Sequence, residues 1–132
     1  MSMDHLSNML SSIKNASMAN NAFVETIHTK ELEEVAKTLK KAGFLEEVKV
    51  FKQEGNSFKG LHLDLVKENG KVKLLDLKRF SKPGRRVYKS YKDIGKSMGG
   101  FGIFVVSTSR GIMDGSEARK KKLGGELICE VK

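Results

Sequence analysis

The sequence predicts an α+β fold of two small packed domains. Two amphipathic helical segments lie in the first third of the chain, alternating strand patterns separated by turn signals follow, and one short helix lies near the end. A chain of 132 residues is long enough to bury a sizeable core. We expect residues 1–70 to form an α+β domain with two helices and a small sheet. Residues 71–132 are expected to form a mostly β domain with a short helix.

The first two helices follow from apolar spacing and from residues suited to helix ends. Ser2 or Asp4 can cap the first helix, which ends near Asn20, and its buried stripe is Leu6, Met9, Leu10 and Ile13. Thr29 predicts the N-cap of the second helix, and Gly43 its end. Glutamates near its start and lysines near its end suit the helix dipole.

Extended segments and their turns account for most of the remaining chain. Asn69-Gly70 predicts a two-residue hairpin, and Pro83-Gly84 a type II turn. Asp114, with Glu117 three residues later, predicts the start of the short third helix. Strand patterns occur at residues 22–28, 46–50, 61–65, 71–80, 85–89, 103–106 and 126–131.

The charge is unevenly distributed between the two halves of the chain. Residues 1–66 hold 8 Lys and Arg against 9 Asp and Glu, whereas residues 67–132 hold 17 against 7. A strongly basic half indicates a polyanionic partner, with nucleic acid favoured over an anionic membrane because the cations lie among strands. No apolar run approaches membrane-spanning length, and the single cysteine, Cys129, suits a reducing compartment. We therefore expect a cytoplasmic protein.

A row of hydroxyls follows the apolar strand at residues 103–106. Ser107, Thr108 and Ser109 can each donate and accept a hydrogen bond, and Arg110 adds a cation suited to phosphate. One interpretation is a recognition loop at the end of a rigid strand. The other is a strand-to-helix connection whose hydroxyls only cap the helix. Spacing alone leaves both open.

Cations and one aromatic ring also gather near residues 85–89. Tyr88 can stack on a base while Arg85 and Arg86 hold phosphates, or it can simply pack against the sheet. The run Arg119–Lys122 offers further cations, although one helix cannot direct four consecutive side chains at one surface.

The enzymatic alternative is a metal-dependent nuclease. Asp64, with Asp76 and Lys78 across a hairpin, has the residue types of such a site: two carboxylates for Mg²⁺ and a lysine beside the attacking water. The histidines and Cys129 lack zinc-ligand spacing, and the chain lacks phosphate-binding-loop and nucleophile-elbow motifs. We expect no catalytic residue, no metal and no cofactor.

Three motifs resemble bacterial ribosomal protein number eight of the small subunit. They are Ser81-Lys82-Pro83-Gly84-Arg85-Arg86-Val87-Tyr88, Gly102-Ile103-Phe104-Val105-Val106-Ser107-Thr108-Ser109-Arg110-Gly111-Ile112-Met113, and Leu123-Gly124-Gly125-Glu126-Leu127-Ile128-Cys129. Their order and spacing agree with that family, and the resemblance extends over essentially the whole chain. It implies a non-catalytic protein of two small domains that binds the central domain of 16S ribosomal RNA early in assembly.

The resemblance also implies the contact residues and the partners. The implied RNA-binding residues are Ser107, Thr108, Ser109, Arg110, Tyr88, Arg86, Arg85, Gly124, Gly125, Glu126 and Lys14. Neighbouring ribosomal proteins, among them numbers five and twelve, and the messenger RNA of its own operon are the implied further partners. The chain departs from the family pattern at Ser12, Phe104 and Glu130, and Phe104 predicts altered core packing.

Overall fold

The structure is a computed structural model that describes residues 5–52, 55, 59–73, 76–95 and 102–132. It divides into two compact units, residues 1–75 and 76–132. Both contain helix and sheet, so the predicted α+β class is confirmed. The N-cap predicted at Ser2 or Asp4 lies outside the described residues.

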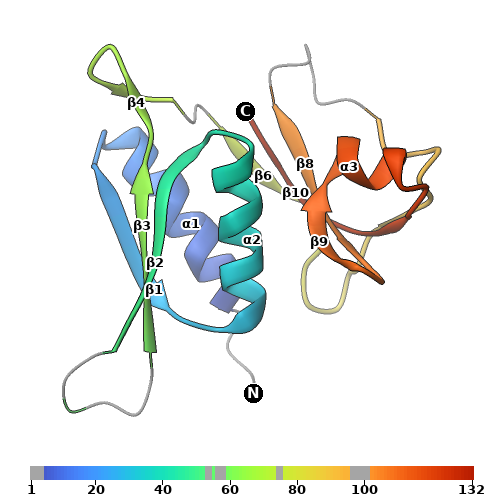
Figure 1. The fold of residues 1–132 in the computed structure, drawn as a ribbon, viewed down its shortest axis with the longest axis horizontal. Coiled ribbons are helices and arrows are strands. Elements are labelled where there is room, and N and C mark those ends of the chain that lie inside the picture. The colour runs from blue at the N-terminus through green and yellow to red at the C-terminus, as the bar shows by residue number, and fades with distance from the viewer. Residues whose placement is uncertain (1–4, 53–54, 56–58, 74–75, 96–101) are drawn as a thin grey trace. The chain divides into compact units, whose positions relative to one another are not determined.

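The first unit packs two helices on one side of a three-stranded antiparallel sheet (Figure 1). The strand order is β1-β3-β2, with β3 in the centre. A two-stranded hairpin follows β3, and its turn residues Asn69 and Gly70 have φ values of 54° and 80°, which confirms the turn predicted there. The elements are α1 (His5–Met18), β1 (Phe23–Ile27), α2 (Lys30–Lys41), β2 (Leu45–Lys52), β3 (Lys59–Leu65), β4 (Lys67–Glu68) and β5 (Lys71–Val72).

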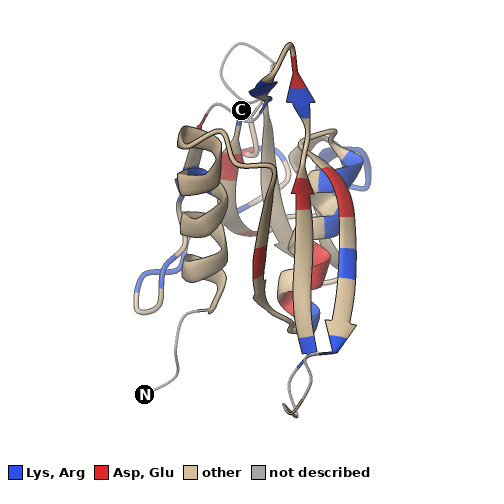
Figure 2. Cartoon of the chain, turned by 90° about the vertical axis from the view of Figure 1, so that its left-hand side faces the viewer, with Lys and Arg blue, Asp and Glu red and all other residues tan. Residues whose placement is uncertain are grey.

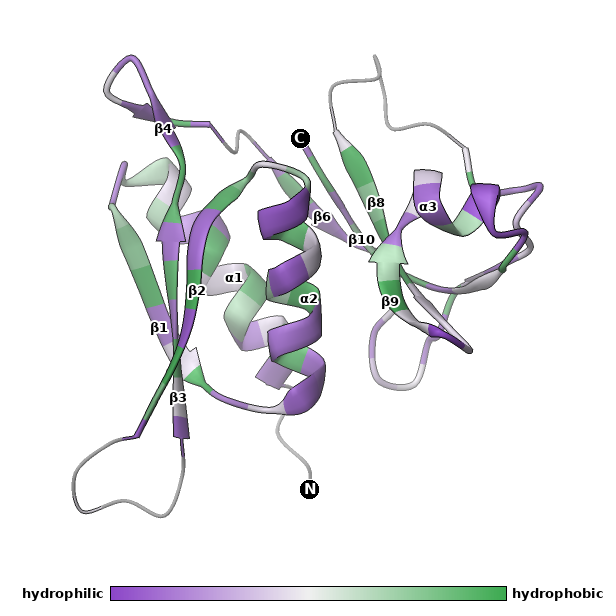
Figure 3. Cartoon of the chain, in the orientation of Figure 1, coloured by the Kyte–Doolittle hydropathy of each residue, from purple (hydrophilic) through white to green (hydrophobic). Residues whose placement is uncertain are grey.

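The core of the first unit lies between the helices and the sheet. Thr29 caps α2 as predicted, because its side chain accepts a hydrogen bond of 3.2 Å from the backbone N–H of Leu32. Figure 3 shows hydrophilic and hydrophobic residues alternating around the turns of α2. The alternating leucines of β3, Leu61, Leu63 and Leu65, are buried, whereas His62 and Asp64 between them are partly exposed. The period of two in this strand therefore identified the buried face correctly.

The second unit is built around the last strand of the chain. Strand β10 pairs with β8 along one edge, and its other edge pairs with β7 at one end and with β6 at the other, always antiparallel. Strand β9 continues the sheet beyond β8. The elements are β6 (Leu77–Arg79), β7 (Tyr88–Lys89), β8 (Ile103–Thr108), β9 (Gly111–Asp114), α3 (Gly115–Lys120) and β10 (Gly125–Val131).

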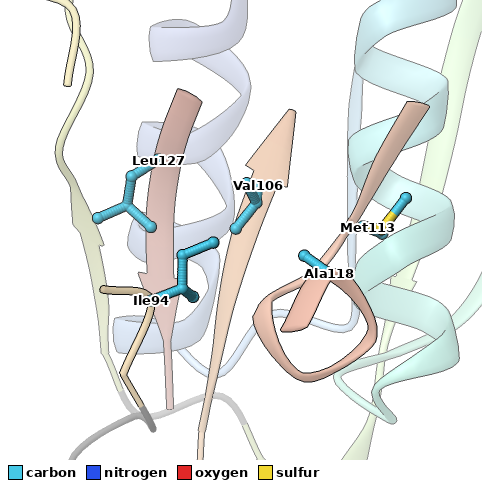
Figure 4. Close-up of a cluster of buried hydrophobic side chains, with 5 residues drawn as sticks. All are labelled: Ile94, Val106, Met113, Ala118 and Leu127. Atoms are coloured by element: carbon cyan, nitrogen blue, oxygen red, sulfur yellow. The ribbon is translucent and has the colours of Figure 1, made fainter. Parts of the chain in front are cut away.

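An apolar cluster joins α3 to one face of this sheet. It consists of Ile94, Val106, Met113, Ala118 and Leu127, drawn in Figure 4. Phe104, the departure noted in the sequence, packs against this cluster with its ring centroid 6.0 Å from that of Phe80. The two rings line a partly open pocket of about 210 Å³ together with Ile94 and Leu127.

Two predicted elements are wrong, and both errors concern hairpins. The single strand expected at residues 71–80 is two short strands in different sheets, since β5 pairs with β4 and β6 pairs with β10. The expected strand-to-helix loop after Val106 is a β-hairpin: β8 continues through Thr108 and returns as β9. Periodicity shows which residues are extended, but it does not show with which strand each one pairs.

A β-bulge interrupts the pairing of β10 with β8 between Leu127 and Cys129. The alternation predicted for the last strand, with Leu127 on the same face as Cys129, is therefore broken. Leu127, Ile128 and Cys129 are all buried. The bulge places Leu127 opposite Val106 and Cys129 opposite Val105, so these two residues lie on opposite faces of the sheet, and both are buried.

Candidate nucleic-acid interface

Four strands of the second unit place one side chain each in a single row across the sheet. The register pairs Tyr88 of β7 with Glu126 of β10, Glu126 with Ser107 of β8, and Ser107 with Ile112 of β9. Directly opposed residues in antiparallel strands project on the same face, so these four side chains are neighbours. We call Tyr88, Glu126, Ser107 and Ile112 the four-residue row.

The row combines an aromatic ring, a carboxylate and a hydroxyl. Tyr88 is 69% exposed, which excludes the alternative in which it packs against the sheet. Among the described residues, the hydroxyls of Ser107 and Ser109 have no hydrogen-bond partner, so both are available to a ligand. Such a surface can stack on a base and can exchange hydrogen bonds with base edges or ribose hydroxyls.

The hydroxyl of Thr108, in contrast, forms hydrogen bonds within the β8–β9 turn. It donates to the carbonyl oxygen of Gly111 at 2.8 Å and accepts from the backbone N–H of Arg110 at 3.2 Å. Thr108 also lies on the face opposite Ser107, because neighbours in a strand alternate. Gly111, with φ of 115°, completes the turn, and Ser109 and Arg110 are exposed at its tip. Thr108 thus shapes the hairpin that presents Ser109 and Arg110.

Arg86 is tied to the row by an ion pair. Its Nη1 donates to Oε2 of Glu126 at 3.0 Å, and the side chains of Arg86 and Glu126 are 50% and 18% exposed. The mostly buried carboxylate therefore fixes a half-exposed guanidinium beside Tyr88. The pair brings a cation to the row and offsets the negative charge at its centre.

Arg85 lies in a tight turn formed by Lys82–Arg85. The N–H of Lys82 donates to the carbonyl of Arg85 at 3.0 Å, and the N–H of Arg85 donates to the carbonyl of Lys82 at 2.9 Å. Gly84 has φ of 80°, in agreement with the predicted type II turn. The buried Ser81 closes the loop behind this turn: its hydroxyl accepts from the N–H of Val87 at 2.9 Å. The loop therefore presents Arg85 and Arg86 on a fixed backbone.

The two glycines before Glu126 allow three strands to approach one another closely. A Cβ on Gly125 would lie 2.1 Å from the carbonyl oxygen of Ser107, and one on Gly124 would lie 2.6 Å from that of Lys89. A side chain at either position would push β7 or β8 away from β10. The geometry thus explains these glycines through the backbone that positions the row.

The remaining candidates lie apart from the row or are explained by structure. Lys14 is exposed on α1 of the first unit. Cys129 is buried as expected, and burial raises the pKa of its thiol to about 12, so it stays uncharged at neutral pH. Across the described ranges, no helix is long and apolar enough to cross a membrane.

The residues of the nuclease alternative are engaged in other contacts. Oδ1 of Asp64 lies 3.0 Å from Nε2 of His62 in the first unit. Asp76 belongs to the second unit, where its side chain accepts from the N–H of Leu77 at 2.9 Å and its backbone pairs with Lys132. In the part of the chain that the structure describes, no three His, Cys, Asp or Glu side chains form a group that could hold a metal ion.

Sequence reasoning missed two contributors, Ile112 and Ser81. Ile112 supplies an apolar end to the row, and only the unpredicted β8–β9 hairpin places it there. The segment Ser109-Arg110-Gly111 between two extended runs was the signal for that hairpin. Ser81 carried no such local signal, since its partner Val87 is six residues away.

Comparisons with known proteins identify relatives of this chain. The family described as ribosomal protein S8 matches residues 4–131. "Small ribosomal subunit protein uS8" of Trichodesmium erythraeum is 43% identical over 97% of this chain and 96% of its own length. "Small ribosomal subunit protein uS8c" of Welwitschia mirabilis is 40% identical over 98% of this chain and 99% of its own length.

These proteins are structural components and not enzymes, so the nuclease alternative is rejected. The match spans both units, including the four-residue row. The chain therefore belongs to the ribosomal protein S8 family and is an RNA-binding structural constituent of the small ribosomal subunit.

Proposed function

We propose that this protein binds the central domain of 16S ribosomal RNA early in subunit assembly, and that the four-residue row with the Ser109-Arg110 turn is its principal contact. The observation that carries the proposal is the alignment of Tyr88, Glu126 and Ser107 on one face, with Arg86 paired to Glu126. The family supports ribosomal RNA as the ligand.

The row suits nucleosides, and its surroundings suit phosphates. Tyr88 offers a stacking surface, and Ser107 offers a donor and an acceptor to a base edge or a 2′-hydroxyl. Glu126 accepts from amino groups and keeps Arg86 in place. Arg85, Arg86 and Arg110 then bind the flanking backbone, which adds affinity without reading sequence. The RNA would therefore present a distorted minor groove or a bulge, because the deep groove of regular A-form RNA hides its base edges.

The other residues that the family resemblance implies have supporting roles in this proposal. Gly124 and Gly125 hold the strands close enough for the row to form, and Thr108 shapes the adjoining turn. Lys14 on α1 would contact the RNA backbone separately from the row. Neighbouring proteins numbers five and twelve, and the messenger RNA of its own operon, are proposed as further partners of a cytoplasmic ribosome.

A binding footprint tests the proposal directly. The protein is incubated with a central-domain transcript and with a matched transcript from another domain of the same RNA, and hydroxyl-radical cleavage of both is compared. We expect protection confined to the central domain that disappears in Ser107→Ala/Ser109→Ala. Equal protection of both transcripts would contradict it. Adding the protein before or after the other subunit proteins, and comparing the yield of subunits, tests the early step.

A further inference from the structure

The hairpin β4–β5 carries cations in a unit that is otherwise slightly acidic. Lys67 and Lys71 are exposed, and neither has an ion-pair partner among the described residues. The acidic residue of the hairpin, Glu68, instead lies 4.0 Å from Nζ of Lys73. Figure 2 shows the hairpin as the upper tip of the strands in the foreground, with both of its strands carrying cations. Glu68 lies directly opposite Lys71 in the ladder and Lys67 opposite Val72, so the two lysines project on opposite faces of the hairpin, each without an ion pair in the described part of the chain.

A residue far away in the sequence holds this hairpin in place. Nδ2 of Asn20 donates to the carbonyl oxygen of Gly70 at 2.8 Å, and Oδ1 of Asn20 accepts from the N–H of Val72 at 2.9 Å. These bonds cross 50 and 52 residues of sequence. They grip the hairpin on both sides of its turn, so the two lysines project from an ordered backbone. Cations on an ordered backbone lose less backbone freedom when a ligand binds.

Asparagine meets two demands at position 20. Its φ of 58° lies in the left-handed region, where it ends α1, and the N–H of Asn21 bonds back to the carbonyl of Ala16 at 2.8 Å. Glycine would adopt this backbone equally well but has no side chain. Aspartate could accept from Val72 but has no N–H to donate to Gly70. Asn20 is therefore suited to the hairpin contact as well as to the helix end.

We infer that the β4–β5 hairpin is a second contact to the phosphate backbone of the bound RNA, with Lys67 and Lys71 as its ligand groups and Asn20 as the residue that positions them. The inference rests on the proposed function. Ammonium groups without carboxylate partners complement a polyanion. The hairpin is also the last element of the first unit before the basic second unit, which continues the run of cations along the chain.

The experiment compares two pairs of lysines in the strands of the first unit. Lys67→Gln/Lys71→Gln removes the hairpin charges, and Lys52→Gln/Lys59→Gln removes two exposed charges that face each other at the opposite end of β2 and β3. Affinity for the central-domain transcript is measured between 50 and 300 mM KCl. Each phosphate contact contributes roughly 0.7–0.9 to the slope of log K against log salt. We expect the hairpin variant to lose about 1.4–1.8 in slope and the control variant to keep the wild-type slope.

Substitutions of Asn20 separate positioning from charge. Asn20→Gly keeps the left-handed backbone and removes both side-chain bonds, whereas Asn20→Asp keeps only the bond from Val72. We expect the Val72 amide to exchange its hydrogen faster in the glycine variant, with a smaller slope of RNA binding although every lysine is present. Rapid exchange at Val72 with an unchanged slope would show that Asn20 has only a structural role.

The outcomes distinguish this inference from the proposed function. If Ser107→Ala weakens binding while the hairpin variant keeps its slope, the inference is wrong and the proposed function stands. If the two lysine variants lost the same amount of slope, the loss would reflect net charge alone, and the inference about the hairpin would be overturned. Poor incorporation of the hairpin variant into subunits with unchanged RNA binding would indicate an acidic protein partner instead. No binding of the wild-type chain to the transcript would overturn both.

Discussion

Arg86 and Glu126 lie 40 residues apart in the sequence and are joined by a hydrogen-bonded ion pair of 3.0 Å at the edge of the four-residue row. The pair links the loop that precedes β7 to the beginning of strand β10. The guanidinium is half exposed and the carboxylate is mostly buried, so the arginine presents more of the pair's surface to solvent. The two residues should therefore act as one unit in RNA binding.

A double-mutant cycle measures this coupling. We expect Arg86→Ala and Glu126→Ala each to weaken binding to the central-domain transcript, and the double variant to lose less than their sum, with a coupling of about 0.5–3 kcal/mol. The control cycle pairs Glu126→Ala with Lys92→Ala, whose ammonium instead lies 5.9 Å from the Tyr91 ring centroid. Additive losses in the first cycle would show that Glu126 does not position Arg86.

Ser107 and Ser109 are predicted to affect binding without affecting folding. Their hydroxyls have no partner in the described parts of the protein, so replacing both with alanine leaves no buried group unpaired. We expect affinity for the RNA to fall by roughly 1–3 kcal/mol for the lost hydrogen bonds, with an unchanged melting temperature. Filter binding and calorimetry on the same samples check both parts. Unchanged affinity would remove these hydroxyls from the interface.

Thr108 should show the opposite response. Thr108→Val keeps the shape of the side chain but removes the bonds to Gly111 and Arg110. We expect the free energy of unfolding to fall by about 1–2 kcal/mol, because two turn contacts are lost. Denaturant unfolding measures this change against Ser107→Ala as the matched control. A variant as stable as the wild type would mean that the turn does not depend on this hydroxyl.

Gly125 is predicted to be intolerant of even a methyl group. In Gly125→Ala the new Cβ would meet the carbonyl oxygen of Ser107 at 2.1 Å, which forces β8 and β10 apart. We expect a loss of about 1–3 kcal/mol in unfolding free energy. Gly95→Ala is the control, because no heavy atom lies within 4 Å of its Cβ position and its φ is not positive. Equal stability of the two variants would contradict the close approach.

His62 gives the first unit a predicted pH dependence. A hydrogen bond from Nδ1 to Glu25 at 2.8 Å, and a second contact to Asp64, raise the pKa of His62 above 6.5 despite partial desolvation. A raised pKa means that the folded state holds the proton more tightly. The added stability is therefore full below pH 6.5 and is lost as pH rises through the folded value.

Glu25→Gln tests this dependence. We expect the variant to bring the His62 pKa closer to 6.5 in an NMR titration. Its stability should fall below that of the wild type at pH 5.5, and the difference should shrink by pH 8.5. Asp64→Asn is the comparison and should have the smaller effect, since the Glu25 bond is the larger cause. A difference in stability that does not vary with pH would rule out the ion pair as its source.

Local signals predicted much of the first unit and little of how the second unit's strands pair. Thr29 capped α2, the leucines of β3 faced the helices, and Asn69-Gly70 formed its turn, because each depends on residues close in sequence. The row depends on pairings such as Tyr88 with Glu126, and no local pattern encodes them. Resemblance to a family named most of the row, but only the register showed that Ser107 and Thr108 face opposite ways.

The β-bulge after Leu127 determines where the last strand can change in length. Removing Ile128, the extra residue of the bulge, would leave Leu127 opposite Val106 and Cys129 opposite Val105, so every other residue would keep its partner and its face. Removing a residue outside the bulge would shift the register of the shorter part and turn its side chains to the other face of the sheet. A shortened strand is therefore compatible with the binding face and the core at the bulge, whereas the same change elsewhere in β10 would break one of them.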